Sequence, residues 1–488
     1  MASLEELRSI RIEKLNELRK RGINPFPSRT QRTHLINEVL GSFENLSESK
    51  EAITVSGRIR GLRSHGGSLF LDIEDTSGTI QVFCDKATLG EETYDTVSTL
   101  FDLGDIIEAS GSAFRTKQAV MTIHSSNMRM LAKAIRPLPD THFGLKDKEE
   151  RLRRRFLDLA VNAETRELFK RKAVFWKSAR YFLEERGFIE VDTPALQDVA
   201  GGADATPFTT HHNALDKDFY LRISLEIPLK KIIIGSFEKV YEIGKVFRNE
   251  GISSEHLQDY IECEFYWAYA DYSDMMAFVE SMFRHIATET TGSLNTSYDG
   301  KKIDWAGEWE KADFIELLEK HLSIKLSELN TDDKLREYAE SLGLSTESAW
   351  GWGRILDHIW KKKVRPNIVG PMFLVNHPVE VSPLAKSSEN NPDVVERLQV
   401  IAGGMEVGNG WSELNDPEEQ KRRFDAQQML RDKGDEEAQM KDESFIEALE
   451  YGMPPTAGFG FSERLFALLM DRPVRETVIF PPMREEND

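Results

Sequence analysis

A cation and a carboxylate stand two residues apart in the segment FRNEGISSEH, residues 247–256. Arg248 and Glu250 follow an alternating apolar run, so we expect them to project from one face of a strand. The next alternating run, residues 259–272, predicts a partner strand with polar side chains on one face. These are Tyr260, Glu262, Glu264 and Tyr266. Since carboxylates are rarely buried without partners, such a hairpin either binds a cation or is an ordinary solvent-facing sheet.

A second candidate strand, GGMEVGNGWSELND at residues 403–416, adds polar groups of the same kind. Asn409, Trp411 and Glu413 share one register of the alternation. Glu406 falls in the opposite register, so a bulge at the nearby glycines is needed to bring it to the same site.

A third segment, GFGFSERLFALLM at residues 458–470, predicts a strand, an N-cap at Ser462 and a helix. Arg464 then lies in the first helical turn, where the helix macrodipole disfavours a cation. A bound anion such as phosphate would explain the arginine, and a salt bridge to a local carboxylate is the alternative.

The bulk composition is that of a globular chain of two or three domains, with 488 residues and a net charge of −20. The charge does not exclude a nucleic-acid partner, because binding follows local basic patches such as RLRRRF at residues 151–156. Cys84 and Cys263 alone make neither a disulfide framework nor a zinc site, which predicts a reducing cytoplasm. No apolar run is long enough to span a membrane, and the charged N-terminus lacks a signal core.

Elements along the chain must position these groups, and their pattern changes near residue 51. Leucines at helical spacing predict a helix up to Gly22 within an N-terminal helical extension, residues 1–50. Period-two alternation then predicts a small β-barrel at residues 51–134, with Phe70 on the face opposite Leu69 and Leu71. A proline-rich linker, residues 135–150, precedes an α+β domain at residues 151–488 that begins with a long helix ended by Gly187.

In this order the segments resemble the three signature motifs of class II aminoacyl-tRNA synthetases, and nearly the whole chain is similar to the lysyl-tRNA synthetase family. The three motifs correspond to residues 187–196, 247–272 and 452–465. Segments particular to that family resemble residues 201–224, 377–386 and 406–416. The resemblance implies an N-terminal OB-fold barrel for the anticodon and a catalytic domain built on an antiparallel sheet flanked by helices. It also implies ATP-dependent ligation of L-lysine to tRNA(Lys) through a lysyl-adenylate, with Mg²⁺ as cofactor, in a cytoplasmic homodimer.

The resemblance also implies a role for each matching residue. Arg248, Glu250 and Arg464 correspond to the catalytic set that holds the phosphates. The ATP-binding set comprises Arg248, Glu250, His256, Tyr260, Glu406 and Arg464, with Glu406 as the Mg²⁺ ligand. The lysine-binding set comprises Gly202, Glu226, Arg248, Glu264, Tyr266, Asn409, Trp411 and Glu413. Phe70 and Gln81 correspond to positions that read the anticodon. In this arrangement the carboxylates of Glu264 and Glu413 would pair with the ε-ammonium of lysine and would repel the side-chain carboxylate of aspartate.

Three positions depart from the family pattern. Gln399 stands where a second metal-binding carboxylate is usual, so the number of Mg²⁺ ions is open. Asn127 replaces a glutamate expected in anticodon reading, and Glu255 replaces an arginine in the second motif. The alternatives are a ligase for aspartate or asparagine, a tRNA-binding paralogue without activation chemistry, and an enzyme that transfers lysine to a protein.

Overall fold

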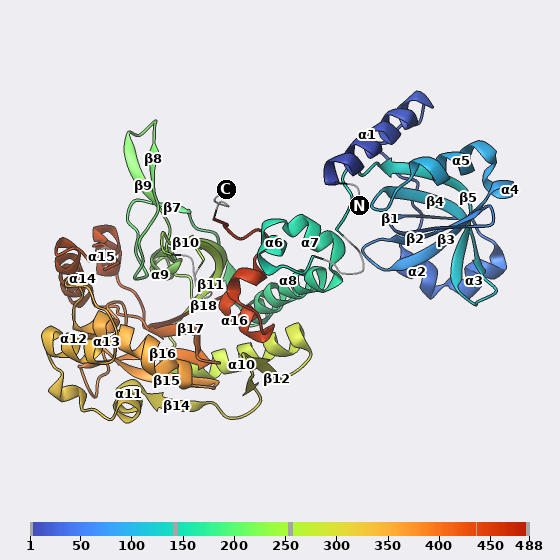
Figure 1. Ribbon diagram of the computed structural model, residues 1–488. Helices are drawn as coiled ribbons and strands as arrows, with labels where there is room; N and C mark the ends of the chain where they lie inside the picture. The colour runs from blue at the N-terminus through green and yellow to red at the C-terminus, as the bar shows by residue number, and fades with distance from the viewer. Residues whose placement is uncertain (1–2, 140–144, 252–256, 436, 485–488) are drawn as a thin grey trace. The chain divides into compact units, whose positions relative to one another are not determined.

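The computed structural model describes residues 3–139, 145–251, 257–435 and 437–484. The chain forms two compact units, Met1–Asn162 and Ala163–Asp488 (Figure 1). Each unit is described by itself below. Among the described residues, no helix combines the length and the apolar composition needed to cross a membrane.

A closed five-stranded barrel forms the centre of the first unit, in the order β1-β2-β3-β5-β4 (Figure 1). The strands are β1 Ile53–His65, β2 Ser68–Glu74, β3 Thr79–Asp85, β4 Ile106–Arg115 and β5 Met121–Ala132. The helices are α1 Leu4–Lys20, α2 Ile36–Gly41, α3 Phe43–Ser49, α4 Lys86–Leu89, α5 Glu91–Leu100, α6 Lys148–Arg153 and α7 Arg155–Val161. The predicted barrel and the predicted N-terminal helix are both confirmed.

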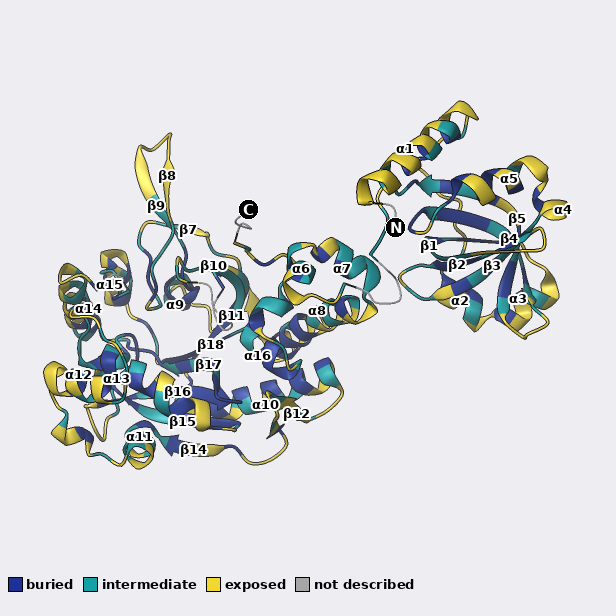
Figure 2. Ribbon diagram, viewed as in Figure 1, coloured by how far each residue is buried: buried dark blue, intermediate teal, exposed yellow. Residues whose placement is uncertain are grey.

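Alternation along the strands determines the barrel core. Leu69, Leu71 and Ile73 are buried, while Phe70 and Asp72 on the other face are partly exposed. Figure 2 shows buried residues along the strands of the barrel. The period-two pattern therefore identified the inner and outer faces of β2 correctly.

An eight-stranded sheet forms the centre of the second unit, in the order β14-β15-β16-β17-β18-β11-β10-β6. The strands are β6 Ile189–Glu190, β10 Lys239–Phe247, β11 Asp259–Ala268, β14 Glu310–Asp313, β15 Met372–Pro378, β16 Val394–Ala402, β17 Met405–Ser412 and β18 Thr456–Ser462. Neighbouring strands are antiparallel except at the two edges, where β6 and β14 run parallel to their partners. The predicted antiparallel sheet flanked by helices is confirmed.

Helices cover the two faces of this sheet. The main core packs α8 (Ala163–Glu184), α10 (Tyr272–Thr291) and α16 (Glu463–Leu469) against one face. A second cluster packs α9 (Glu226–Ile234), α14 (Pro417–Asp432) and α15 (Glu443–Glu450) at the other face. A third cluster involves α11 Phe314–Leu322, α12 Asp332–Ser341, α13 Trp352–Ile359 and the π-helix Trp360–Val364.

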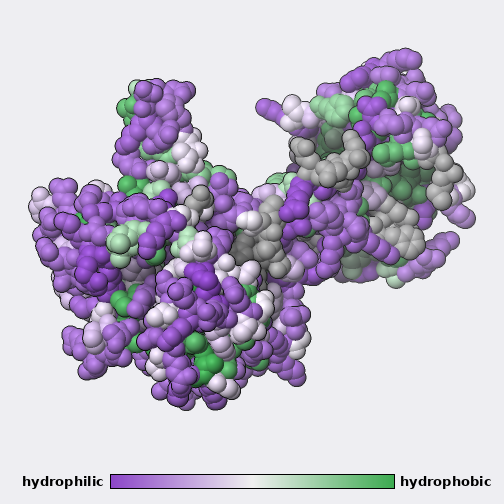
Figure 3. Space-filling model, turned by 60° about the vertical axis from the view of Figure 1, so that its left-hand side comes forward, coloured by the Kyte–Doolittle hydropathy of each residue, from purple (hydrophilic) through white to green (hydrophobic). Residues whose placement is uncertain are grey.

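Smaller elements complete the second unit. A three-stranded sheet joins β7 (Leu196–Gln197), β8 (Thr209–His212) and β9 (Lys217–Leu221). The β8–β9 hairpin projects from the unit, and β8 is exposed along its whole length (Figures 1 and 2). Its surface is mainly hydrophilic (Figure 3). The hairpin β12–β13 spans Asn295–Tyr298 and Lys301–Asp304, and short 3-10 turns lie at Leu326–Glu328, Arg365–Asn367, Val379–Val381 and Val474–Thr477.

Two details of the predicted hairpin are wrong. Strand β10 ends at Phe247, so Arg248 and Glu250 lie just beyond the strand rather than within it. The partner strand was predicted over residues 259–272, but β11 ends at Ala268, and the next residue, Tyr269, has a φ of 63° and is 70% exposed. Strand ends are poorly defined by alternation, because hydrogen bonding and not side-chain type ends the ladder.

The start of α16 is fixed to two neighbouring elements by one buried carboxylate. Glu463 accepts a hydrogen bond from the backbone N–H of Ile261 on β11 at 2.8 Å. Its other oxygen pairs with the ammonium of Lys172 on α8. Ser462 is the N-cap, as predicted, and its hydroxyl accepts from the N–H of Arg464 at 3.3 Å. These contacts set the direction from which Arg464 leaves the helix.

Lys172→Met should destabilise the second unit, because it leaves the side chain of Glu463, which is 4% exposed, without its cation. A buried carboxylate that loses its partner costs about 3 kcal/mol, and we expect the free energy of unfolding to fall by that amount. All eight tryptophans lie in this unit, so tryptophan fluorescence during urea unfolding measures it. The matched control is Lys170→Met, whose side chain is 63% exposed. Equal effects of the two substitutions would contradict the interpretation.

Candidate active site

Three neighbouring strands bring the polar groups of separate segments into register. Strand β18 lies between β11 and β17, so Glu264 pairs with Gly460 and Gly460 pairs with Asn409. One step along the strands, Tyr266 and Trp411 pair with Gly458. Successive positions on one face of a strand are about 7 Å apart, which is close to the length of an extended lysine side chain.

Glycines on the central strand leave its backbone bare on the site face, and neighbouring side chains pack directly against it. We call this strip of backbone, together with the side chains beside it, the trough. A Cβ at Gly458 would lie 2.2 Å from Oε1 of Glu413 and 2.4 Å from Cε1 of Tyr266. A Cβ at Gly460 would lie 3.2 Å from Cγ of Glu264. The floor of the trough is therefore bare backbone, and its walls are the carboxylates and the phenol.

The glycines of β17 serve the opposite face of the same sheet. A Cβ at Gly408 or Gly410 would lie 2.3 or 2.7 Å from ring atoms of Phe459. The aromatic ring thus takes the space that side chains at these positions would need. Glycine is therefore required here because the ring of Phe459 lies close to the backbone of β17.

Glu264 is held on the trough wall by three donors. Its Oε1 accepts from the N–H of Leu225 at 2.7 Å and from the hydroxyl of Ser224 at 3.0 Å. Its Oε2 accepts from the hydroxyl of Tyr266 at 2.9 Å. Burial raises the pKa of Glu264, and these three hydrogen bonds partly offset the effect.

Glu413 and Glu226 are the other two buried carboxylates, each 2% exposed. Oε2 of Glu413 accepts from Nε1 of Trp411 at 2.7 Å and pairs with the ammonium of Lys230. Oε1 of Glu413 is buried and has no hydrogen-bond partner. Burial raises the pKa of Glu413 to about 7, although Lys230 opposes the rise.

Gly202 closes the trough beside Glu226. Its φ is 87°, and a Cβ there would lie 2.5 Å from the hydroxyl oxygen of Ser224 and 2.9 Å from Cβ of Glu226. A side chain is therefore excluded both by conformation and by space. Oε1 of Glu226 pairs with Lys230, one helical turn later on α9.

Asn409 and Glu406 lie on β17 and are oriented by β16. Nε of Arg397 donates to Oδ1 of Asn409 at 2.9 Å, so the amide Nδ2 is the donor left for a ligand. The predicted bulge is present, because the register shifts between Val400 and Ile401 opposite Gly408 and Glu406. Nε2 of Gln399 donates to Oε2 of Glu406 at 3.2 Å, which confirms that the bulge turns Glu406 to the site face.

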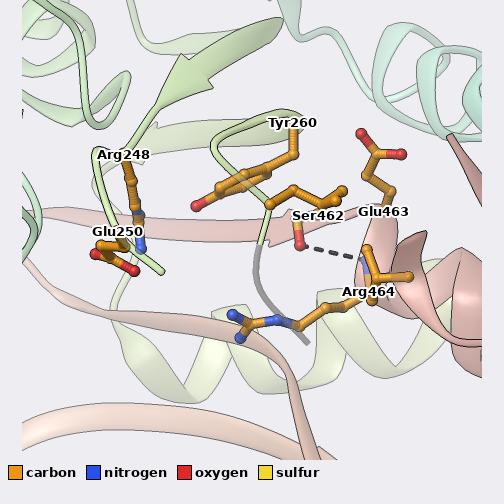
Figure 4. A pocket seen from close by; sticks show the side chains of 8 residues that line it. Arg248, Glu250, Tyr260, Ser462, Glu463 and Arg464 are labelled. Atoms are coloured by element: carbon orange, nitrogen blue, oxygen red, sulfur yellow. Dashed lines mark hydrogen bonds between the residues drawn. The ribbon is translucent and has the colours of Figure 1, made fainter. Parts of the chain in front are cut away.

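A pocket adjoins the trough at the ends of β10, β11 and β18. Figure 4 shows Arg248 and Glu250 on one side, with the guanidinium of Arg464 pointing toward them and the ring of Tyr260 nearby. The guanidinium carbon of Arg248 lies 5.5 Å from the centre of the Tyr260 ring. The other lining residues are Leu257, Ser462, Glu463 and Val474.

The electrostatics of this pocket favour an anion. Burial lowers the pKa of Arg248, but the neighbouring Tyr260 and the carboxylates Glu262, Glu250 and Glu264 raise it further, so the guanidinium stays charged. Glu262 lies on the same strand face, with Oε2 buried and without a hydrogen-bond partner. Burial, followed by repulsion from Glu264, raises the pKa of Glu262 to about 8.

The outer face of the barrel in the first unit carries an aromatic cluster. The rings of Phe70 and Phe83 lie 5.0 Å apart, and Phe114 and His124 pack next to Phe83 at 5.9 and 5.2 Å. Oε1 of Gln81 accepts from the hydroxyl of Thr122 at 3.1 Å. Partly exposed aromatic rings beside an amide form a platform suited to stacking and reading unpaired bases.

Sequence reasoning missed several residues of the site. Lys230 and Arg397 orient carboxylates and Asn409 from segments whose pattern is that of an ordinary helix or strand. Ser224 orients Glu264 and ends the segment 201–224, but its residue type did not indicate that role. Phe114 and His124 join the aromatic cluster from the neighbouring strands β4 and β5. His256 and Glu255 lie outside the described residues.

The comparisons with known proteins agree with this arrangement. Residues 147–484 match the family of tRNA synthetases class II (D, K and N), and residues 53–138 match the OB-fold nucleic acid binding domain. A lysine–tRNA ligase from Roseiflexus castenholzii is 45% identical over 99% of each chain. This chain belongs to the lysine–tRNA ligase family of class II. Lysine–tRNA ligases from Carboxydothermus hydrogenoformans and Bacillus subtilis are 43% and 39% identical over 99% of this chain and 98% of theirs.

Glu413→Gln should remove part of the pH dependence of stability. The folded-state pKa of about 7 lies above the usual 4.5, so the folded protein keeps a proton that the unfolded chain releases between these pH values. Stability is therefore lost as the pH rises through this window. From pH 5 to pH 8, the free energy of unfolding of the wild type should fall by about 2 kcal/mol more than that of the variant, measured by urea unfolding. The exposed Glu447→Gln is the control, and parallel pH profiles of wild type and Glu413→Gln would refute the pKa assignment.

Proposed function

We propose that this protein joins L-lysine to tRNA(Lys) in two steps, first forming lysyl-adenylate from lysine and ATP and then transferring the lysyl group to the tRNA. The observation that carries the proposal is the trough, in which three buried carboxylates surround a bare glycine floor. Family membership supports the same conclusion. The protein acts mainly by orienting the reactants and by stabilising charge on the phosphates.

For lysine, the trough supports a pose that runs along the strands. The α-carboxylate lies at Arg248 and at Nδ2 of Asn409, and the α-ammonium lies near Glu226 and the backbone of Gly202. The ε-ammonium reaches Glu264, Tyr266 and the free Oε1 of Glu413, with Trp411 beside the aliphatic stem. The unpartnered Oε1 supports this end of the pose, since a buried carboxylate oxygen without a donor is costly until a cation binds.

For ATP, the pocket of Figure 4 supports a pose with adenine stacked on Tyr260 and the α-phosphate at Arg248. Arg464 holds the γ-phosphate, and Glu250 contributes with His256 near the adenine and the phosphates. The planar guanidinium of Arg248 can bind the carboxylate of lysine and the α-phosphate at once, which brings the reacting atoms together. Arg248, Glu250 and Arg464 are therefore the proposed catalytic residues.

Mg²⁺ fits the donors present when it arrives with ATP. No group of three His, Cys, Asp or Glu side chains able to hold a metal exists among the described residues. Glu406 faces the site, however, and the unpartnered Oε2 of Glu262 is a second carboxylate oxygen near it. Mg²⁺ commonly uses one or two carboxylates together with phosphates, and it would neutralise phosphate charge here. Gln399 supports a small number of ions, because its amide donates to Glu406.

The barrel and the exposed apolar groups support the remaining parts of the proposal. Phe70 and Gln81 read the anticodon within the domain at residues 51–134, which a linker at 135–150 joins to the catalytic domain at 151–488. A homodimer forms through the first motif, where Ile189 and Leu196 are 52% and 45% exposed although apolar. The protein works in the cytoplasm. An aspartate or asparagine ligase fits less well, because carboxylates at Glu264 and Glu413 would repel or fail to pair with those side chains.

Lysine-dependent exchange of pyrophosphate into ATP tests the activation step. We expect exchange with lysine and none with aspartate or asparagine, because the trough offers carboxylates and no free cation at its far end. Chelation of Mg²⁺ with EDTA should abolish exchange, and added Mg²⁺ should restore it. Folded protein that binds tRNA but shows no exchange with any of the three amino acids would instead identify a binding paralogue.

Phe70→Ala should separate tRNA recognition from amino-acid activation. Loss of one stacking platform costs about 1–3 kcal/mol, so we expect the KM for tRNA(Lys) in aminoacylation to rise about tenfold or more. Pyrophosphate exchange, which needs no tRNA, should be unchanged. Phe26→Ala, which removes another exposed aromatic of the first unit, is the control and should change neither assay. An unchanged KM for tRNA(Lys) in Phe70→Ala would remove Phe70 from the anticodon site.

A further inference from the structure

Lys230 is a fully buried cation behind the proposed lysine trough. Its side chain is 0% exposed, and its ammonium pairs with Glu226 one turn earlier on α9 and with Glu413 after β17. The rings of Trp411 and Phe445 lie 5.9 and 5.7 Å from the ammonium. A lysine is almost never fully buried, because desolvation of an ammonium is costly unless carboxylates compensate. Its position therefore calls for an explanation beyond packing.

The contacts of Lys230 leave one side of Glu413 open. The ammonium and Nε1 of Trp411 both bind Oε2 of Glu413, so this oxygen is fully used by the protein. Oε1 is buried without a partner and lies on the side of Gly458, whose missing Cβ would be 2.2 Å away. Lys230 thus binds the carboxylate from behind, and the oxygen that faces the trough remains available to a ligand.

Lys230 offsets part of the negative charge of the trough. Glu226, Glu264 and Glu413 contribute three negative charges when ionised, and Glu262 lies on the same strand face as Glu264. The ammonium of Lys230 pairs with Glu226 and Glu413, so it directly compensates two of these carboxylates. Without Lys230, both would face the neighbouring carboxylates without a cation.

We infer that Lys230 is a positioning residue for the substrate, whose ammonium orients Glu226 and Glu413 and lowers the net negative charge around them. The inference rests on the proposed function. It assigns Lys230 no contact with the substrate, since the oxygen of Glu413 that the substrate meets is not the one that Lys230 binds. This role explains why a cation lies inside a site for cations: it opposes the uptake of protons by Glu226 and Glu413 in place of the substrate.

The pH dependence of lysine binding follows from the groups that face Lys230. These are Glu226 on α9 and Glu413 after β17, and the ring of Phe445 on α15 also lies near the ammonium. Glu264 and Tyr266 on β11 act on Glu226 and Glu413 in turn. Burial raises the pKa of Glu413 to about 7, and Lys230 opposes the rise. Since the substrate ammonium replaces a proton, lysine should bind more tightly as the pH rises through about 7. Loss of Lys230 removes the opposing charge and should move this midpoint upward.

The test compares wild type, Lys230→Met and Lys230→Arg by kcat/KM for lysine in pyrophosphate exchange from pH 6 to pH 8.5. We expect the midpoint to rise by about one pH unit or more in Lys230→Met, with kcat/KM at pH 7 reduced about tenfold. The KM for ATP should stay within about twofold, and Lys230→Arg should restore most of the wild-type profile. Lys231→Met, on the same helix and 36% exposed, is the matched control and should leave the profile unchanged.

A uniform loss at every pH, with the midpoint unmoved, would overturn the inference and leave Lys230 as a packing residue. An unchanged profile would overturn it as well. If Lys230→Met fails to fold, Lys230→Gln carries the same expectation, because its amide can still donate to one carboxylate but has no charge. If wild type itself shows no lysine-dependent exchange, the proposed function fails, and this outcome is distinct from an unmoved midpoint.

Discussion

Three carboxylates buried side by side are the constraint on which the catalytic unit depends. Glu226, Glu264 and Glu413 are between 2% and 6% exposed, and like charges at close range cannot all ionise without compensation. The fold supplies it from separate elements: hydroxyl and backbone donors bind Glu264, and Lys230 binds the other two. The compensation is incomplete, because one oxygen of Glu413 has no partner. A bound cation would supply the partner that this oxygen of Glu413 lacks.

The shape of the site depends on backbone rather than on side chains. Gly458 and Gly460 keep the central strand bare on the site face, while Gly408 and Gly410 on the next strand make room for Phe459 on the core face. A single pair of strands therefore has glycines for two different reasons. Substituting either pair would alter a different structure, the ligand trough in one case and the main core in the other.

The two ends of the site differ in charge, and this difference gives it a direction. Arg248 and Arg464 make the pocket beyond β10 and β11 suitable for an anion, whereas the trough beyond it suits cations. A molecule with a side-chain ammonium at one end and a reactive carboxylate at the other can lie in only one orientation. In the proposed pose the carboxylate then lies beside the phosphates, which is the geometry that adenylate formation requires.

The sequence by itself predicted the fold class and the family, because these depend on local patterns and ordered motifs. Alternation separated Leu69 and Leu71 from Phe70, and the N-cap at Ser462 was read correctly. The bulge that turns Glu406 to the site was also predicted, since no other geometry would bring both registers to one face.

Tertiary structure alone decided which groups compensate one another. Lys230 lies 183 residues before Glu413 in the chain, and nothing in its helical segment marks it as the partner of that carboxylate. Arg397 and Asn409 are brought together by the pairing of β16 with β17, which the type of neither residue indicates. The alternation of residue types also failed to predict where β10 and β11 end, because a strand ends where its backbone hydrogen bonds to the neighbouring strand end. Residue type and spacing determine which chemistry is available, whereas pairing between distant segments determines which charges are satisfied and which remain for a ligand.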